Sequence, residues 1–369
     1  MRLGMFMMPV HPPARSFTDS LAEDSEKSLL ADALGFDELW IGEHFSASTE
    51  PIPSPLMFMA SLLPRTKNLS FGTAVINLPN HDPVVVAAEV AQFDHMSRGR
   101  FMMGIGPGGL VSDFELFNNA DLGVRTRKLM ESIGMIECIW SQDPPYDLEG
   151  EFWTVRLRDA IVPQLGIGYM PKPFQKPGPP ISISLASPHS STARTAALQG
   201  WGILSANIIP TYSVASHWAI YSKACAEAGK APRGDNWRVA RNVMVAPSDA
   251  EAADRVFGDM GSNRYFYTYM RQVLHKVGLL VVLKPRPDMP DDDATVEAIT
   301  EACVLYGSPK TTLDKLIAFR DQVGPFGTLL MTGLDWGGPN EQWERESMRL
   351  LAQEIMPKFR QHVMARAAE

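Results

Sequence analysis

Short strand-like runs alternate with longer helix-like segments along most of this 369-residue chain. Apolar, β-rich runs bounded by turn residues are typical of buried strands, and apolar stripes at helical spacing indicate helices. We expect eight strands, at Leu3–Met8, Glu38–Ile41, Leu69–Ile76, Arg100–Ile105, Ile181–Ala186, Ile203–Ala206, Arg238–Ala246 and Thr328–Thr332. We expect helices at Asp19–Leu34, Ser54–Leu63, Pro83–Met96, Arg125–Trp140, Ser190–Gln199, Val214–Ala228, Pro309–Val323 and Glu341–Met356, the last ended by Pro357.

Eight such units favour an α/β fold of one kind, a closed parallel (β/α)8 TIM barrel with insertions. The alternative is an open, doubly wound sheet followed by a second domain. The even spacing of the first four strands and the lack of a linker favour the barrel. We therefore expect a single domain over residues 1–369, with insertions at 141–179 and 258–300, the second a candidate lid.

Charge and cysteine content limit the partners that this chain is expected to have. The net charge is −8 and the basic residues form no stripe, so no nucleic-acid or membrane partner is expected. The chain shows no signal peptide and no apolar run long enough to span a bilayer. Its three cysteines lie far apart without a CxxC motif, which is typical of reduced thiols and predicts a cytoplasmic protein.

Several motifs that would identify a catalytic class are missing from the sequence. It contains no phosphate-binding G-x-x-x-x-G-K-[ST] loop, no H-E-x-x-H and no G-x-S-x-G elbow. It also contains no cluster of Cys and His with metal-ligand spacing, so no metal site is expected. Nucleotide hydrolysis by a phosphate loop, zinc proteolysis and serine-elbow hydrolysis therefore have no support.

In a parallel barrel the active site lies at the carboxyl ends of the strands, and His44 directly follows the second expected strand. A histidine at this place can act as a general base near neutral pH or donate to a developing oxyanion. The alternative is a hydrogen-bonded structural histidine. His11, His81 and His189 also lie on rim loops and are weaker candidates.

The segment 104–109, GIGPGG, formally matches the G-x-G-x-x-G pattern after a strand. A dinucleotide site needs a helix that begins within the pattern, but Pro107 removes a donor and no long helix follows. We favour a different role, in which backbone without side chains lets a flat ring approach closely.

The turn after the fifth expected strand, 187–191, has the sequence SPHSS. Hydroxyls at a helix N-terminus suit a phosphate, because free N–H groups and the helix dipole both favour an anion. Ordinary N-capping by serine is the alternative. Arg125 and Arg127 could supply a counter-charge, although arginines early in a helix are usually just solvated.

Taken together, these motifs resemble the bacterial-luciferase-like flavin monooxygenases over nearly the whole chain. The resemblance is carried by LGMFMMPVHPP, GFDELWIGEHF, VVVAAEVAQFDHMSRGRFMMGIG, DFELF, RKLME, GSPKTTLDKL and SMRLLAQEIMPKF. It implies a single barrel with insertions, usually dimeric. It further implies reduced FMN from a separate flavin reductase, reaction with O2 to a flavin hydroperoxide, and transfer of one oxygen atom to a small, largely apolar organic substrate.

The resemblance also assigns roles to individual residues. His44 matches the catalytic histidine of the family, and Ala74–Val75 matches a dipeptide, often joined by a cis bond, that supports the flavin ring. Asn77 is placed at the polar edge of the ring, and Gly106 lies against it. Ser187, Ser190 and Ser191 match the phosphate-binding turn, and Arg127 matches an arginine directed towards that phosphate.

Three departures from the luciferases limit how far the roles of their residues can be assigned to this chain. Gly106 stands where luciferases carry a reactive cysteine, so no thiol chemistry beside the flavin is expected. The acidic residue that opens the luciferase phosphate turn is missing. The aldehyde pocket does not transfer either, because Pro79, Asn80 and Leu110 form a different wall.

Two other functions remain open at this point. One is hydride transfer through a deazaflavin by an enzyme of the same superfamily, and the other is a non-catalytic flavin-binding subunit. The helices near 55–63 and 84–91 are small and apolar on more than one side, which predicts a homodimer through them.

Overall fold

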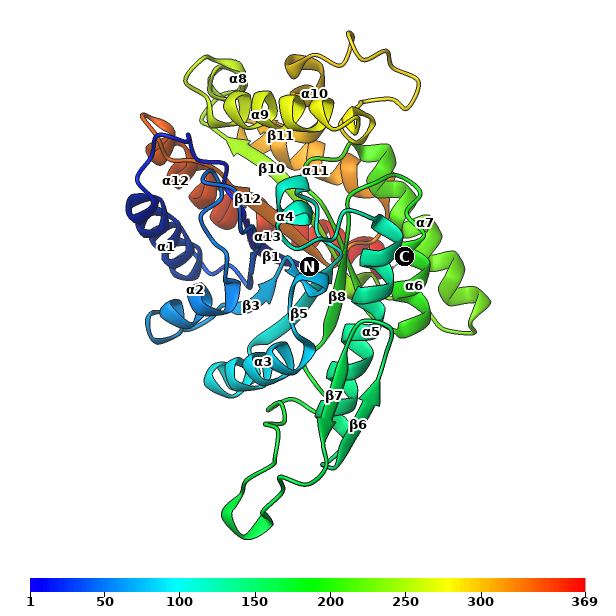
Figure 1. The fold of residues 1–369 in the computed structure, drawn as a ribbon. Coiled ribbons are helices and arrows are strands. Elements are labelled where there is room, and N and C mark those ends of the chain that lie inside the picture. Colours follow the sequence, from blue (N-terminus) through cyan, green and yellow to red (C-terminus); the bar gives the residue numbers. More distant parts are fainter. Residues whose placement is uncertain (369) are drawn as a thin grey trace.

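The structure is a computed structural model that describes residues 1–368, and it confirms the closed parallel barrel (Figure 1). Strand β1 pairs with both β2 and β12, while β9 pairs with β10, placing Ile203 opposite Trp237 and closing the ring. An open, doubly wound sheet is therefore excluded. The ring consists of β1 (Arg2–Met7), β2 (Glu38–Ile41), β3 (Ser70–Thr73), β5 (Phe101–Gly106), β8 (Ile181–Leu185), β9 (Gly202–Ser205), β10 (Trp237–Val245) and β12 (Thr328–Gly333).

The helices surround the ring, and most begin and end within a few residues of the expected positions. Their starts follow local capping chemistry: the Asp82 carboxylate accepts from the Val84 amide at 2.8 Å, just before Pro83 opens its helix. The surrounding helices are α1 (Phe17–Ala33), α2 (Pro55–Leu62), α3 (Pro83–Ser97), α5 (Leu122–Ser141), α6 (Thr192–Gln199), α7 (Thr211–Glu227), α11 (Pro309–Val323), α12 (Asn340–Leu350) and α13 (Met356–Ala368).

The third strand is shorter than expected. Instead of one run over 69–76, β3 ends at Thr73 and a separate strand, β4 (Ile76–Asn77), pairs with β5. The residues between them, Ala74 and Val75, are joined by a cis peptide bond, as the family resemblance predicted. This break lies at the carboxyl end of the strand, where the site is expected.

The expectation that Pro357 ends the last helix is wrong. Residues Leu351–Ile355 form a π-helical turn, in which the Met356 amide donates to the Leu351 carbonyl, and α13 continues beyond it. A wider turn changes the hydrogen-bond register immediately before the proline. The missing N–H of Pro357 is therefore accommodated without ending the helix.

The two stretches expected as insertions carry structure of their own. Between α5 and β8 lies a hairpin of β6 (Tyr146–Glu149) and β7 (Thr154–Leu157), at the bottom of Figure 1. Between β10 and β12 lie the helices α8 (Asp249–Phe257), α9 (Ser262–Lys276) and α10 (Val296–Cys303). They are followed by β11 (Val304–Gly307), which pairs with β10 outside the ring. This group packs over the top of the barrel around Met244 and Leu334, at the carboxyl ends of β10 and β12.

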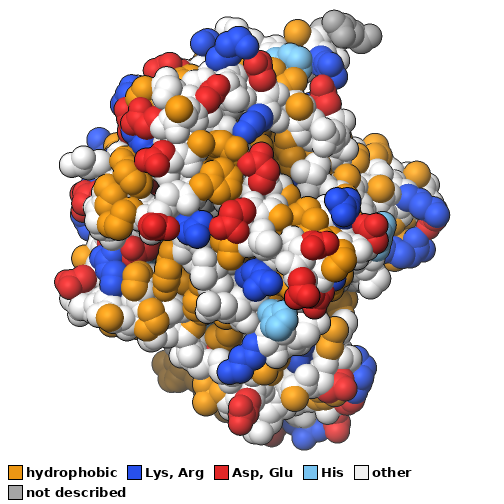
Figure 2. Space-filling model, turned by 90° about the horizontal axis from the view of Figure 1, so that it is seen from above, with side chains coloured by type: hydrophobic (Ala, Val, Ile, Leu, Met, Phe, Trp, Pro, Cys, Tyr) orange, Lys and Arg blue, Asp and Glu red, His pale blue; other side chains and the backbone are white. Residues whose placement is uncertain are grey.

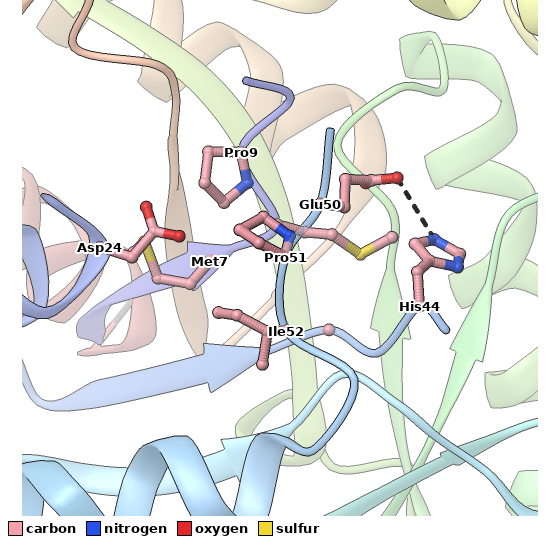
Figure 3. Close-up of a pocket in the computed structure, with 9 residues that line it drawn as sticks. Met7, Pro9, Asp24, His44, Glu50, Pro51 and Ile52 are labelled. Atoms are coloured by element: carbon pink, nitrogen blue, oxygen red, sulfur yellow. Dashed lines mark ion pairs between the residues drawn. The ribbon is translucent and has the colours of Figure 1, made fainter. Parts of the chain in front are cut away.

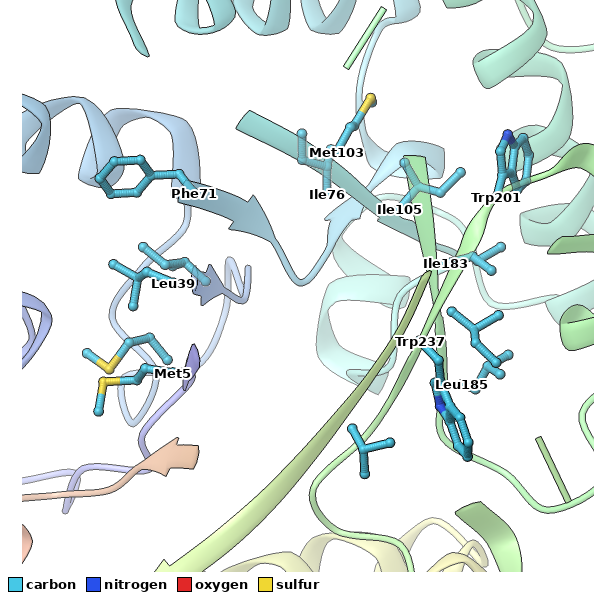
Figure 4. Packing of buried hydrophobic residues seen from close by; sticks show 14 of the residues in the cluster. Met5, Leu39, Phe71, Ile76, Met103, Ile105, Ile183, Leu185, Trp201 and Trp237 are labelled. Atoms are coloured by element: carbon cyan, nitrogen blue, oxygen red, sulfur yellow. The ribbon is translucent and has the colours of Figure 1, made fainter. Parts of the chain in front are cut away.

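Side chains point alternately to opposite faces along each strand, and this alternation separates two apolar regions. Alternate residues such as Met5, Leu39 and Phe71 point outward and pack under the helices (Figure 4). The residues between them, including Phe6, Trp40 and Met102, fill the interior of the barrel. At its amino-terminal end the barrel is closed by a buried ion pair between Glu38 and Arg238, whose charged atoms lie 3.0 Å apart. This leaves the carboxyl end for a ligand.

Two features of the exterior bear on possible partners. Acidic and basic side chains are interspersed with apolar ones over the face seen from above (Figure 2). Of the helices that the structure describes, none is both long and apolar enough to cross a bilayer.

Candidate active site at the barrel mouth

His44 lies just beyond the end of β2, on the carboxyl side of the barrel, and its side chain is 10% exposed. Its Nδ1 atom is 3.2 Å from Oδ2 of Asp113, and its Nε2 atom is 3.6 Å from Oε2 of Glu50. The imidazole is thus held between two carboxylates, one on each ring nitrogen. Its place at the carboxyl end of the barrel, together with a carboxylate near each ring nitrogen, supports a role in proton chemistry.

Asp113 was not among the sequence candidates. It lies on the short helix α4 (Val111–Leu116), where its carboxylate accepts from the backbone amides of Phe45 at 3.3 Å and Ser46 at 2.9 Å. The Ser46 hydroxyl donates to it as well. The aspartate therefore ties the loop after β2 to the loop after β5. The only sequence signal was its place in DFELF, a few residues past the end of the β5 strand.

Glu50 was also missed, because it lies six residues beyond His44 on an irregular loop. Its carboxylate points at the imidazole of His44, and both side chains border a hollow at the barrel mouth that has room for about one water molecule (Figure 3). The hollow has mostly apolar walls, supplied by Met7, Met8, Pro9, Gly42, Pro51 and Ile52, with Asp24 on its far side. The site thus combines one charged pair with an apolar lining.

Burial and neighbouring charge shift the three ionisable groups in different directions. Burial lowers the pKa of His44, but Glu50, Asp113 and Glu43 together raise that pKa above its ordinary value. Burial raises the pKa of Glu50, and the negative charge of Asp113 raises it further, against the lowering effect of His44. Burial also tends to raise the pKa of Asp113, but hydrogen bonds from His44, Ser46 and the Phe45 amide hold that pKa below its usual range. His44 and Glu50 therefore both retain protons to higher pH than usual, while Asp113 stays ionised.

The break between β3 and β4 places Ala74 and Val75 at the mouth, each 9% exposed. Asn77 follows and is buried: its amide nitrogen donates to the Glu43 carboxylate at 3.1 Å, and its Nδ2 atom donates to the Glu43 carbonyl at 3.2 Å. His81 meets the same carboxylate at 3.0 Å. The backbone N–H and one N–H of Nδ2 are thus used within the protein, and the Oδ1 atom, for which no hydrogen bond is recorded among the described residues, is the polar group for a ligand.

Gly106 ends β5 and lies beside Val75. A Cβ atom on Gly106 would lie 2.6 Å from Cγ2 of Val75, so the bare backbone makes room for this side chain. Gly104 is constrained in the same way, because a Cβ atom there would lie 1.7 Å from the Thr73 carbonyl oxygen. Packing between β3 and the end of β5 therefore explains Gly104 and Gly106. Beyond the strand, a Cβ atom on Gly108 would lie 3.1 Å from the Phe114 ring, and only Gly109 borders open space.

The turn between β8 and α6 presents its serines to solvent. Ser187 and Ser191 are exposed and Ser190 is half-buried. Ser190 accepts from the Thr192 amide at 3.3 Å, whereas the hydroxyl of Ser191, at the N-cap position, makes no capping bond. A local turn bond therefore accounts for the hydroxyl of Ser190, and the Ser191 hydroxyl is left available to an anion.

The two arginines of α5 are engaged elsewhere in this structure. Arg127 is 54% exposed and makes two hydrogen bonds, at 3.0 and 3.1 Å, to Glu151 beside the β6–β7 hairpin. Arg125 is buried and donates to the carbonyls of Asn119 and Ala120. The structure therefore brings His44, Ala74, Val75, Asn77 and Gly106 to the mouth, but it records no contact between Arg127 and the serine turn.

His11, a weaker candidate on the loop after β1, is fully buried in a cluster of charged residues. Its Nδ1 atom lies 2.7 Å from Asp335, and its Nε2 atom lies 3.3 Å from Asp24. Ligand atoms of His11, Glu23 and Asp24 lie within 4.8 Å of one another, but Arg15 and Lys27 already bring positive charge into this cluster. The cluster therefore acts as an internal ion-pair network between α1 and the loop after β12.

Helix α9, within the candidate lid, touches the loops that carry these groups. The hydroxyl of Tyr269 lies 3.1 Å from that of Thr49, next to Glu50, and the Tyr265 hydroxyl donates to the His11 carbonyl at 3.4 Å. Asn263 accepts from Asn242 of β10 at 3.0 Å. In this structure the helix is docked on the mouth.

Comparison with known proteins extends these observations. A family model described as luciferase-like monooxygenase matches residues 1–324. The chain is 31% identical, over 362 residues, to 4-hydroxyprotoasukamycin monooxygenase of Streptomyces nodosus subsp. asukaensis, and the match covers 96% of this chain and 91% of that protein.

Two solved structures share the fold. One is a type II Baeyer–Villiger monooxygenase in complex with FMN, the oxygenating constituent of 3,6-diketocamphane monooxygenase from the CAM plasmid of Pseudomonas putida. It has a TM-score of 0.87 and 25% identity, over 97% of this chain and 98% of that one. The other is the coenzyme F420 dependent tetrahydromethanopterin reductase from Methanopyrus kandleri, with a TM-score of 0.69 and 16% identity, over 97% and 99%. The second likeness concerns the fold alone.

Proposed function

This chain belongs to the luciferase-like monooxygenase family, and from that premise we propose that it is the oxygenase component of a two-component, FMN-dependent monooxygenase. Its substrate would be a small, largely apolar organic molecule. The observation that carries the proposal is His44, held between Asp113 and Glu50 beside a mostly apolar hollow at the carboxyl end of the barrel. A titratable group at the catalytic end of the barrel suits the proton transfers of oxygen insertion, and the apolar side chains around it favour an apolar substrate.

The residues at the mouth fit a flavin in most respects. Ala74 and Val75 would support the ring, and the Oδ1 atom of Asn77 would meet its polar edge. The phosphate would lie at the turn of Ser187, Ser190 and Ser191, since the uncapped Ser191 hydroxyl at the start of α6 is free to bind an anion. Arg127 does not fit this role in the present structure, because Glu151 already holds its guanidinium.

Reduced flavin, when bound, supplies two electrons to O2, so that one oxygen atom enters the substrate and the other leaves as water. The protein provides the surroundings. Asp113 fixes the Nδ1 side of His44, which leaves Nε2 to hold or release a proton. Helix α9 and the rest of the 258–300 segment would keep water from the mouth during turnover.

Anaerobic binding followed by an oxygen-labelling experiment tests the proposal. The purified protein is titrated under nitrogen with reduced FMN and, separately, with the reduced deazaflavin F420. It is then exposed to ¹⁸O2 with a panel of small cyclic ketones and hydrocarbons. We expect binding of reduced FMN and the transfer of one labelled oxygen atom to at least one compound.

Two outcomes would favour the alternatives. Tight binding of the deazaflavin alone would indicate hydride transfer without oxygen chemistry. If the protein binds reduced FMN but consumes oxygen no faster than free flavin does, the chain is a non-catalytic flavin-binding subunit.

A homodimer and a separate flavin reductase complete the proposal. The homologous Pseudomonas protein is described as an oxygenating constituent, which supports a separate source of reduced flavin.

Two exposed apolar side chains support the homodimer: Met57 on α2 is 75% exposed and Val85 on α3 is 49% exposed. We expect light scattering to give twice the mass of one chain, and Met57→Glu to reduce it to one chain. A wild-type mass of one chain would contradict the dimer.

A further inference from the structure

The carboxylate of Glu50 has one partner, which distinguishes it from the other carboxylate on His44. Asp113 accepts hydrogen bonds from two backbone amides and a hydroxyl in addition to the imidazole. Glu50 is largely buried, at 12% exposure, and the only polar contact recorded for its carboxylate among residues 1–368 is His44 Nε2 at 3.6 Å. A buried carboxylate held by a single group is poorly stabilised as an anion, so its charge depends on that group.

The loop that carries Glu50 is fixed from both sides. The His44 amide donates to the Ile52 carbonyl at 3.3 Å, and the His11 amide donates to the Thr49 carbonyl at 2.8 Å. The Tyr269 hydroxyl of α9 meets Thr49 from above. The distance between Glu50 and His44 therefore depends on the docking of the loop beneath α9.

We propose that Glu50 is a positioning residue that keeps a proton on the Nε2 atom of His44. The two atoms lie 3.6 Å apart, beyond hydrogen-bond distance, so Glu50 acts through its charge: the negative carboxylate stabilises the proton on the Nε2 atom. Asp113 fixes the opposite ring nitrogen and prevents the ring from turning. The inference rests on the proposed role of His44 in oxygenation, and it adds the group that controls the proton at that residue.

The charges around His44 and Glu50 determine in which direction the pKa of His44 moves when the charge of Glu50 is removed. His44 faces the carboxylates of Glu50, Asp113 and Glu43, all of which raise its pKa. Glu50 faces His44, Asp113 and His11, with Tyr269 nearby on α9 and Asp24 across the hollow. Loss of the Glu50 charge removes one of the three negative charges that raise the pKa of His44, so the imidazole would lose its proton at lower pH.

The experiment measures the titration of His44 directly, by NMR of the ring protons in the flavin-free protein. His44→Gln identifies the signal by its disappearance. Glu50→Gln keeps the shape of the side chain and removes its charge, and Glu50→Asp keeps the charge on a shorter side chain. Glu115→Gln, on the exposed face of α4, is the matched control.

We expect the midpoint of the His44 titration to move to lower pH in Glu50→Gln, to recover in part in Glu50→Asp, and to stay in place in Glu115→Gln. The basic limb of the pH profile for oxygenation should move in the same direction. An unchanged midpoint in Glu50→Gln, or an equal shift in Glu115→Gln, would overturn the inference. Because the titration needs neither flavin nor substrate, failure of the proposed monooxygenase activity would leave this result intact.

Discussion

The Nδ1 atom of His11 lies 2.7 Å from Oδ1 of Asp335, and both side chains are buried. His11 is on the loop after β1 and Asp335 is on the loop after β12, so the contact joins two neighbouring strands at the barrel mouth. On the other side of the ring, Nε2 of His11 meets Asp24 of α1. One imidazole therefore connects three elements next to the proposed site.

This arrangement makes the stability of the fold depend on pH. Burial lowers the pKa of His11, but Asp24 and Asp335 outweigh burial and raise that pKa from 6.5 to about 9. Because the folded protein binds the proton more tightly than the unfolded chain, the contribution is fully present below pH 6.5. It is lost as the pH rises through about 9 and amounts to roughly 3 kcal/mol.

Urea denaturation between pH 6 and pH 10 measures this effect. We expect the free energy of unfolding of the wild type to fall across the range, and that of His11→Gln to start lower and change less. Burial also raises the pKa of Glu344 from 4.5 to about 7. The stability that protonated Glu344 contributes is therefore lost as the pH rises from about 4.5 to 7, before His11 loses its proton. Equal slopes for wild type and His11→Gln above pH 7 would contradict the prediction.

Gly106 and Gly109 form a matched pair at the end of β5. A Cβ atom on Gly106 would lie 2.6 Å from Val75, whereas nothing lies within 4 Å of the corresponding position on Gly109. We expect Gly106→Ala to reduce stability by about 1–3 kcal/mol, because Val75 is buried and must move. Gly109→Ala should be close to neutral. Thermal melts of the two variants would decide the matter, and equal effects would show that Val75 yields easily.

The parts of the fold that follow a repeating pattern could be predicted from the sequence. Strand residues such as Met5 and Phe71 lie in short apolar, β-rich runs bounded by turn residues, and these runs indicate the eight strands without any tertiary information. The end of the last helix could not be predicted, because a π-helical turn before Pro357 depends on packing that has no local sequence signal.

The residues of the site likewise divide into those that could be predicted from the sequence and those that could not. His44 could be identified because it stands directly at the end of a strand, in a position that the barrel makes functional. Asp113 and Glu50 could not, since Asp113 lies on the short helix α4 and Glu50 on an irregular loop, and sequence spacing does not show that either approaches His44. Their carboxylates reach His44 only through the folding of these segments. The pairing of Arg127 with Glu151 likewise depends on a hairpin that the sequence pattern did not indicate.

The serine turn predicts a difference between FMN and riboflavin, which lacks the phosphate. If the Ser191 hydroxyl contacts the phosphate, Ser191→Ala should weaken binding of reduced FMN several-fold and leave reduced riboflavin unaffected. Ser141→Ala, which removes an exposed hydroxyl at the end of α5, serves as the control. Anaerobic fluorescence titration provides the measurement, and equal losses for both flavins would place the phosphate elsewhere.

The role of His44 leads to the last prediction. General acid–base groups contribute about 10²–10⁴-fold to rates, so His44→Ala should reduce oxygenation of any accepted substrate by at least about 10²-fold. Binding of reduced FMN should change much less, because the ring is expected against Ala74 and Val75. Removal of the imidazole also leaves Asp113 bound by Phe45 and Ser46, which preserves the loop. His95→Ala is the control, since this exposed histidine bonds to the Lys172 carbonyl away from the mouth. Undiminished oxygenation in His44→Ala would show that the two carboxylates hold a structural histidine after all.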